Sequence, residues 1–156
     1  MEDAKRDEVS TDRIRLSYGV DYVLRLMRIY TDMMGGDPVR GLIFLAAARA
    51  GTQHLDTGFR PTRTGFVSDA LRRPVSISAL ARSLGLPHET VRRHVIGLVA
   101  AGYASRTARG GVIVTSEHLN QPHIQEAVQA NIINLERLNR SLRMTPRRIV
   151  LESAER

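Results

Sequence analysis

The stretch that decides the fold spans residues 77–115 and reads ISALARSLGLPHETVRRHVIGLVAAGYASRTARGGVIVT. Ser78 is a suitable N-cap for a first helix, and Gly85 ends that helix. A second helix is expected over residues 88–101, with Gly102 directly after it. Apolar residues recur at helical spacing on the inner faces of both helices: Leu80, Ala81, Leu84, Val91, Val95, Leu98 and Val99. Two helices joined by a short glycine turn predict a helix-turn-helix.

Two short strands are expected directly after the second helix, over residues 103–107 and 112–115. The turn 108–111, with two glycines, joins them into a hairpin, which in this position is a wing. A short extended piece, 74–77, precedes the first helix. Residues 74–115 therefore predict a winged helix-turn-helix, in a protein that is mainly α with a small β wing.

The same run resembles the winged helix-turn-helix of bacterial transcriptional regulators, and its local sequence is similar to the DNA-binding domain of IclR-type regulators. The resemblance covers residues 74–115 and implies a DNA-binding regulator. The helical flanks on both sides resemble the MarR arrangement, in which terminal helices build a dimer. The sequence shows no IclR-type ligand domain, so the resemblance does not predict which class of effector the protein binds.

The N-terminal flank predicts two helices. From Arg13, apolar residues spaced by four and three positions form one stripe on a long helix: Leu16, Val20, Val23, Met27, Tyr30 and Met34. Gly35-Gly36 ends this helix, and Asp37-Pro38 begins a second one that runs to Gly51. The expected parts are a disordered arm (1–12), N-terminal helices for dimerisation or the core (13–51), and a connecting loop (52–73).

The C-terminal flank predicts one long helix that begins near Pro122, within a dimerisation segment of residues 116–143. A heptad stripe with one polar interruption runs along it: Ile124, Val128, Asn131, Leu135, Leu138 and Leu142. Such a stripe is typical of helices that pair between chains, and an asparagine in it can fix register. The alternative is packing on the N-terminal long helix within one chain. Residues 144–156 are expected to form a tail.

The positive charge is concentrated in one window. The formal net charge is +7, from 23 Lys and Arg against 16 Asp and Glu. Residues 60–110 hold nine arginines and two acids, Asp69 and Glu89, so this window alone carries nine minus two, or +7. Codon bias explains arginine in place of lysine, but it does not explain the scarcity of acids here. The window is therefore expected to attract a polyanion, nucleic acid before anionic membrane.

The second helix of a helix-turn-helix enters the DNA major groove with its N-terminal residues. Candidate contacts there are His88, Glu89, Thr90, Arg92 and Arg93. Arg93 is the first candidate for base recognition, because a guanidinium can donate two hydrogen bonds to guanine, and Glu89 can accept one from cytosine. Thr90 and Arg92 are expected on phosphates. The alternative is an exposed ion pair between Glu89 and Arg93, which are four residues apart.

Further DNA contacts are expected from the wing and from the segment before the first helix. Arg109 lies at the wing tip beside two glycines and can insert into the minor groove, with Arg106 next to it on phosphate. Arg72 and Arg73 are candidates for clamping the backbone. The alternative for all four is a solvated surface without a binding role.

Several chemistries are excluded or disfavoured. The chain has no cysteine, which excludes disulfides, thiolate zinc sites and a cysteine nucleophile. Its five histidines lack zinc-ligand spacing, and no phosphate-binding loop or G-x-S-x-G turn is present. We therefore expect no catalytic residue, no metal site and no cofactor, hence no enzyme. The longest apolar run, 42–48, is too short for a bilayer, so a cytoplasmic protein without membrane contact is expected.

Together these patterns predict a sequence-specific double-stranded DNA-binding transcriptional regulator that acts as a homodimer. A small apolar effector in a cleft of Met27, Met33, Met34 and Phe44 is a further hypothesis, although such residues usually form core. The alternative function is a winged helix that binds proteins or RNA without operator specificity. The seven aromatic residues form no strand-borne stacking platform, which disfavours single-stranded RNA.

Overall fold

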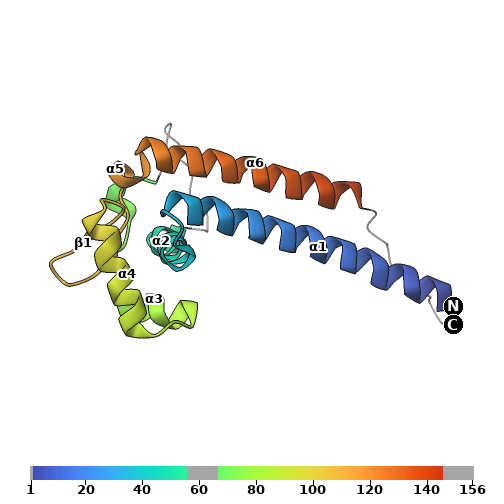
Figure 1. Cartoon of the computed structure of the whole chain (residues 1–156), viewed down its shortest axis with the longest axis horizontal. Coiled ribbons are helices and arrows are strands. Elements are labelled where there is room, and N and C mark those ends of the chain that lie inside the picture. Colours follow the sequence, from blue (N-terminus) through green and yellow to red (C-terminus); the bar gives the residue numbers. More distant parts are fainter. Residues whose placement is uncertain (1, 56–66, 146–156) are drawn as a thin grey trace. The chain divides into compact units, whose positions relative to one another are not determined.

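The computed structural model describes residues 2–55 and 67–145, with side chains from Thr11 onward. The described chain is mainly helical and contains one two-stranded antiparallel sheet (Figure 1). It divides into two compact units. The first combines the residues up to Leu26 with those from Ala130 onward, and the second spans Met27–Gln129. The compact unit around the predicted helix-turn-helix is therefore larger than the expected segment 74–115.

Two long helices contribute to both units: α1 (Glu2–Met33) and α6 (Pro122–Met144). The other elements all belong to the second unit. In chain order they are α2 (Pro38–Ala50), the 3-10 helices η1 (Gln53–Leu55) and η2 (Asp69–Leu71), α3 (Ile77–Leu84), α4 (His88–Ala100), β1 (Ser105–Arg106), β2 (Val112–Ile113) and α5 (Ser116–Leu119).

The pair α3 and α4 forms where the sequence predicted two helices. Gly85 follows α3 with φ of 64°, a left-handed conformation that favours glycine, and its N–H reaches the last carbonyls of α3. The N-cap of α3 is Ser76, whose hydroxyl accepts a hydrogen bond from the Ala79 N–H at 3.1 Å. The expected cap Ser78 is therefore wrong by two residues. The earlier start places Ile77 inside the helix, where it is buried.

The core of the second unit collects side chains from all of its long elements. Val91, Val95 and Leu98 on the inner face of α4 have no exposed area, which confirms the buried stripe predicted for this helix. Other residues at most 4% exposed come from α1, α2, α3, β2 and α6: Tyr30, Ile43, Phe44, Ala47, Leu80, Val112 and Ile124. α2 lies close to the end of α1, because a Cβ at Gly41 would be only 3.0 Å from the Tyr30 carbonyl oxygen.

The hairpin is shorter than expected, with two residues in each strand. Ser105 pairs with Ile113 and Arg106 with Val112, and Val75 forms a bridge to the other side of Val112. The extended piece predicted at 74–77 thus joins the sheet by one bridge. A Cβ at Gly111 would be 2.8 Å from that of Pro74, so glycine permits this close approach.

Two further boundaries differ from the expectation. Residues 2–12 are helical, whereas a disordered arm was expected. This segment has no proline or glycine and is rich in Glu, Asp, Ala, Lys and Arg, so nothing in it stops the helix that begins at Glu2. The expected loop 52–73 contains η1 and η2, while residues 56–66 and the tail 146–156 lie outside the described residues.

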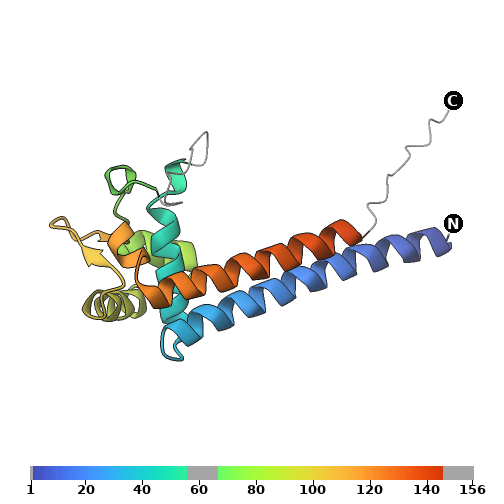
Figure 2. The same ribbon diagram turned by 90° about the horizontal axis from the view of Figure 1, so that it is seen from above.

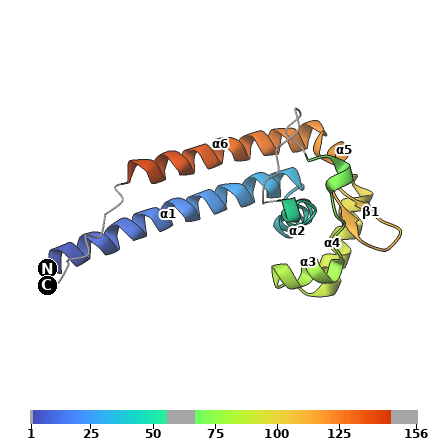
Figure 3. The same cartoon turned by 180° about the vertical axis from the view of Figure 1, so that it is seen from behind.

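In the first unit, the N-terminal part of α1 and the C-terminal part of α6 lie side by side in opposite directions (Figures 2 and 3). Asn134 of α6, which is 4% exposed, donates from Nδ2 to the Tyr22 carbonyl oxygen of α1 at 3.0 Å. We call this antiparallel arrangement the helical pair. Within one chain it realises, for these segments, the packing that the sequence left as the alternative to dimerisation.

Candidate nucleic-acid interface

The outward face of α4 carries Glu89, Arg92 and Arg93, all exposed. Glu89 accepts two hydrogen bonds from Arg92, Nε to Oε2 and Nη2 to Oε1, both at 2.7 Å. These hydrogen bonds lower the pKa of the Glu89 carboxyl, and the charges of Arg92, Arg93 and His88 act in the same direction. The ion pair is therefore between residues three apart, and the suggested alternative pairing of Glu89 with Arg93 is not the one formed.

Arg93 has a different environment from Arg92. It is exposed on α4, and its guanidinium has no hydrogen bond or ion pair with any residue in the described part of the chain. Its donors are therefore available to a ligand. His88 is exposed and Thr90 half-buried in the first turn of the same helix, so the five predicted contacts lie within the first two turns of α4.

A side of α4 next to this outward face contacts the start of α2. Asp37 caps α2 by accepting from the Arg40 N–H at 2.9 Å, and its Oδ2 lies 3.3 Å from Nδ1 of His94. The Arg40 guanidinium lies against Gly97, where a Cβ would approach it to 3.3 Å. His94 and Gly97 therefore contact the start of α2, and because Gly97 lies one helical turn after Arg93, Arg40 borders the outer face of α4.

The turn of the hairpin carries the two arginines assigned to it. Arg106 donates from Nη2 to the Gly110 carbonyl oxygen at 3.0 Å and so braces the turn. Arg109 is exposed and has no hydrogen bond or ion pair within the described residues. Gly110 has φ of 81°, which explains the glycine at this turn. Arg109 is thus the available cation of the hairpin, and Arg106 is partly engaged with the backbone.

Arg72 does not lie on the surface, contrary to the expected role in DNA binding. Its side chain is 3% exposed, pairs with Asp69 at 3.0 Å and donates to the Val67 carbonyl oxygen. Asp69 also accepts from the N–H and hydroxyl of Ser116 at 2.8 and 2.9 Å. Burial by itself raises the pKa of Asp69, but the hydrogen bonds from Ser116 and the charge of Arg72 outweigh it and lower the pKa. Asp69 therefore joins η2 to α5, and the buried Arg72 is held against Asp69 in the same cluster.

Most of the described arginines in the 60–110 window have no carboxylate partner within the described residues. Both acids of the 60–110 window are paired with an adjacent arginine, Asp69 with Arg72 and Glu89 with Arg92. Five exposed arginines then have no carboxylate partner within the described residues: Arg73, Arg82, Arg93, Arg106 and Arg109. Arg82, in the last turn of α3, was not singled out in the sequence, although it belongs to the charged window.

Comparison with protein-family models, curated proteins and solved structures finds no match. The function of this surface is therefore argued from its own geometry and charge. The second unit offers an exposed helix face with a free arginine, a hairpin turn with another, and further arginines on α3 and before it.

A histidine that the sequence left without a role connects the hairpin to α5. His118 is 8% exposed, and its Nδ1 accepts from the Thr115 N–H at 3.0 Å. Nδ1 must therefore be unprotonated, which places the ring proton on Nε2, 3.2 Å from the Ser105 hydroxyl of β1. Burial lowers the pKa of His118, and the charges of Glu117 and Asp69 oppose this only in part.

The residues suggested for an apolar effector are core or half-buried residues. Met34 and Phe44 are at most 4% exposed, and the Phe44 ring lies 6.4 Å from the tilted ring of Tyr30 and 6.0 Å from the ring of Tyr103, which it meets edge to face. A partly open pocket of about 130 Å³ lies instead in the helical pair, between α1 and α6, and is lined by both polar and apolar side chains. Among the described side chains, no three His, Asp or Glu residues gather in a metal-binding arrangement. No described helix combines the length and apolar character needed to cross a membrane.

The residues predicted for dimerisation separate into two groups. Three on α1 and one on α6 are exposed in the single chain: Leu16, Val20, Val23 and Leu135. The others are buried or half-buried: Met27, Ile124, Val128, Asn131, Leu138 and Leu142. Ile124 has no exposed area and belongs to the core of the second unit. Ile124 is therefore used within the chain, and dimerisation through the other residues of the stripe stays a prediction.

Proposed function

We propose that the chain is a sequence-specific double-stranded DNA-binding transcriptional regulator without catalytic activity, built on a winged helix-turn-helix. α3 and α4 are its helix-turn-helix, α4 is the recognition helix in the major groove, and the β1–β2 hairpin is the wing on the minor groove or the backbone. Repression or activation would follow from occupying a promoter.

One observation supports this proposal most directly. The inner face of α4 is fully buried at Val91, Val95 and Leu98, while its outer face presents Arg93, which has no hydrogen-bond or ion-pair partner among the residues that the structure describes. An exposed, unpaired arginine on an otherwise anchored helix suits bidentate recognition of guanine in the major groove. Arg73, Arg82 and Arg109 add cations that suit phosphate contacts and minor-groove insertion.

The test is selection of bound sequences from random duplex DNA by the purified full chain, followed by titration of the best sequence and a scrambled duplex. We expect an enriched sequence and a preference for it of about 10³-fold or more. Affinity for both duplexes should fall steeply with salt, because phosphate contacts release condensed counterions. If no sequence is enriched and binding does not depend on salt, DNA recognition is not the function.

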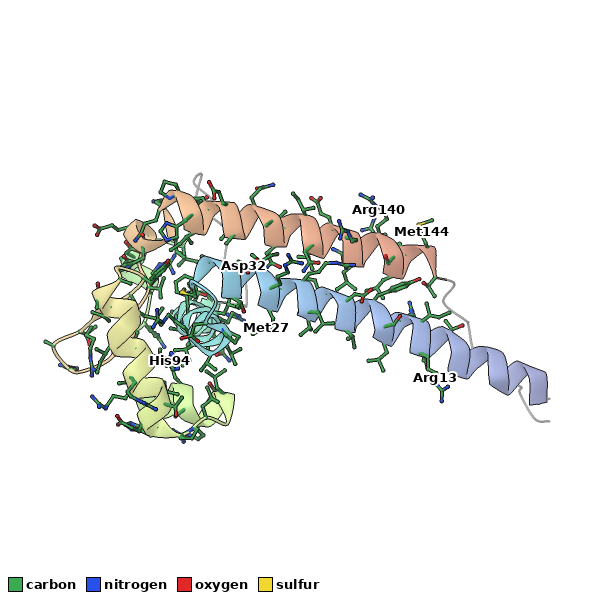
Figure 4. The ribbon with its side chains drawn as sticks, viewed as in Figure 1. Arg13, Met27, Asp32, His94, Arg140 and Met144 are labelled. Carbon is green, nitrogen blue, oxygen red and sulfur yellow. The ribbon has the colours of Figure 1, made fainter. Side chains whose placement is uncertain are left out.

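A matched control distinguishes DNA binding by the α4 surface from simple attraction of DNA to the net positive charge of the protein. Arg140 is exposed on α6, in the helical pair, and points away from α1 (Figure 4). Arg140→Ala removes the same charge as a variant on α4 and should leave DNA affinity within about twofold. Equal losses for Arg140→Ala and for variants on α4 would indicate attraction to net charge alone.

A further inference from the structure

One exposed apolar side chain lies among the charged residues of α4. Ile96, in the third turn of this helix, is 45% exposed. Among the described residues of the second unit, the one other large apolar side chain that is comparably exposed is Leu71 of η2, also at 45%. A single exposed apolar residue is ordinary on a protein surface. The position of Ile96 on α4 therefore decides what it can do.

Ile96 lies on the outer half of α4, next to both arginines. Arg93 precedes it by three residues and Arg92 by four, the spacings at which helical side chains are neighbours. At ~100° per residue, Ile96 lies roughly 60° around the helix from Arg93 and roughly 130° from the middle of the buried inner face. The outer face of α4 thus carries an apolar side chain beside its unpaired arginine.

The two flanks of Arg93 differ in chemistry. On one flank the Arg40 guanidinium of α2 lies against Gly97 and places a cation at the border of the outer face. On the other flank lies Ile96, whose side chain can neither donate nor accept a hydrogen bond. The Arg40 flank therefore suits an anionic or hydrogen-bond-accepting group, and the Ile96 flank suits an apolar one.

DNA offers one apolar group on the base edges of its major groove, the 5-methyl group of thymine. The other base edges present hydrogen-bond donors and acceptors, which an isoleucine side chain would cover without replacing their water. The phosphates are charged and give an apolar side chain no favourable contact. Against a duplex, an isoleucine at this position therefore favours thymine.

We propose that Ile96 contacts the 5-methyl group of a thymine in the major groove and makes thymine a second preferred base beside the guanine assigned to Arg93. This inference rests on the proposed function and adds a specific base to it. Three residues along α4 correspond to roughly 4.5 Å, and base pairs are stacked ~3.4 Å apart. The thymine therefore lies within about two base pairs of that guanine, on the Ile96 flank only.

The test is a uracil scan of the sequence that selection with the full chain enriches. Each thymine is replaced in turn by deoxyuridine, which removes the 5-methyl group and leaves the hydrogen-bonding groups unchanged. One thymine per half-site should be sensitive, within about two base pairs of the guanine whose preference is lost in Arg93→Ala. Its replacement should weaken binding about fourfold, as expected for one methyl group removed from an apolar contact.

Two variants matched in exposure show whether Ile96 is the residue that senses the methyl group. Ile96→Ala should bind the thymine and uracil duplexes equally, and its affinity for the thymine duplex should fall about fourfold or more. Its helix should persist, because the side chain is exposed and alanine has the higher helix propensity; circular dichroism and thermal unfolding check this. Leu71→Ala removes an equally exposed apolar side chain outside α4 and should keep the full difference.

The outcomes distinguish this inference from the function on which it rests. The inference is overturned, and the DNA-binding proposal stands, if the thymine–uracil difference persists in Ile96→Ala or disappears equally in Leu71→Ala. The same holds if no thymine near the guanine is sensitive to the replacement. If selection enriches no sequence, the proposed function fails, and this inference fails with it.

Discussion

Neighbouring arginines on α4 have different surroundings, and this difference decides which of them is available to a base. Arg92 is held by two hydrogen bonds to Glu89, whereas Arg93 has no partner within the described residues. Releasing Arg92 to a ligand would leave Glu89 without its strongest partner. Arg93 is therefore the better candidate for a base edge, and Arg92 for a phosphate that it can meet without leaving Glu89.

The prediction for Arg93 concerns discrimination between sequences. Arg93→Ala should cost about 1–3 kcal/mol per half-site on the preferred duplex and relax preference at one base position, because bidentate contacts carry that discrimination. Arg73→Ala removes an exposed arginine outside the helix. It should weaken binding to preferred and scrambled duplexes alike and lower the salt slope by about one per subunit. Titrations at several salt concentrations distinguish the two, and equal losses on both duplexes for Arg93→Ala would contradict the base-reading role.

His118 gives a second prediction at this scale, in the pH dependence of stability. Protonating Nδ1 would place a proton where the Thr115 N–H already points, so the folded chain binds this proton less readily than the unfolded chain. Its pKa is lowered by folding, and stability is therefore fully present above about pH 6.5, the usual histidine pKa, and is lost as pH falls toward the folded-state pKa.

The measurement is denaturant unfolding of the wild type and of His118→Asn between pH 7.5 and 5. Asparagine keeps an acceptor near the position of Nδ1 but does not titrate. The wild type should lose more stability than the variant across this range. Asp69 acts in the same direction but only at more acidic pH, because its pKa lies below the usual aspartate value. Parallel curves for the two proteins would show that His118 does not titrate on unfolding.

The sequence could predict whether an arginine has an intramolecular partner only where the residues around it are close to it along the chain. The exposed positions of Arg93 and Arg109 follow from helix period and turn position. The burial of Arg72 depends on Asp69, which in turn binds Ser116 at a distance of 47 residues along the chain. A contact of that kind leaves no periodic signal. The choice of Arg92 over Arg93 as the partner of Glu89 is a matter of rotamers, and spacing permits both.

At the scale of elements, the two helices α3 and α4 were predictable because their signals are local. A capping serine, a glycine in the left-handed conformation and two apolar stripes determine α3 and α4. The four-residue helix α5 was missed because it is too short to show a period. The start of α1 was placed too late because the few apolar residues before Arg13 show no helical period, although the composition suits a helix.

Gly85, in the turn between α3 and α4, gives a prediction of whether an alanine substitution raises or lowers the stability of the protein. Gly85 has φ of 64° with nothing within 4 Å of an added Cβ, so Gly85→Ala introduces backbone strain without a clash. It should destabilise the protein by about 1–2 kcal/mol. Gly19, inside α1, also has open space around it, but Gly19→Ala should stabilise its helix by about 0.5–1 kcal/mol. Thermal unfolding of both variants checks the prediction, and a stabilising Gly85→Ala would be inconsistent with the left-handed turn.

At the scale of the whole molecule, the proposed regulator together with the homodimer expected from the sequence gives a prediction about the DNA. A two-fold dimer presents two copies of α4, so the selected sequence should be a palindrome. Its half-sites should lie about 10 bp apart, or a multiple of that. Inserting 5 bp between the half-sites turns one of them to the opposite side of the duplex and should reduce affinity to that of a single half-site. Unchanged affinity after this insertion would show that the two half-sites are not bound together by one dimer.

The second unit takes its core from the ends of two long helices, and this limits how the protein can be cut and recombined. Tyr30 near the end of α1 and Ile124 near the start of α6 are both at most 4% exposed in the same core as α4. An engineer who grafted only residues 74–115 onto another regulator would leave these side chains behind, together with Ile43 and Phe44. The segment to transfer is the whole span Met27–Gln129. Both of its ends lie inside helices, so each fusion must continue a helix of the recipient protein without rotating its side chains about the helix axis.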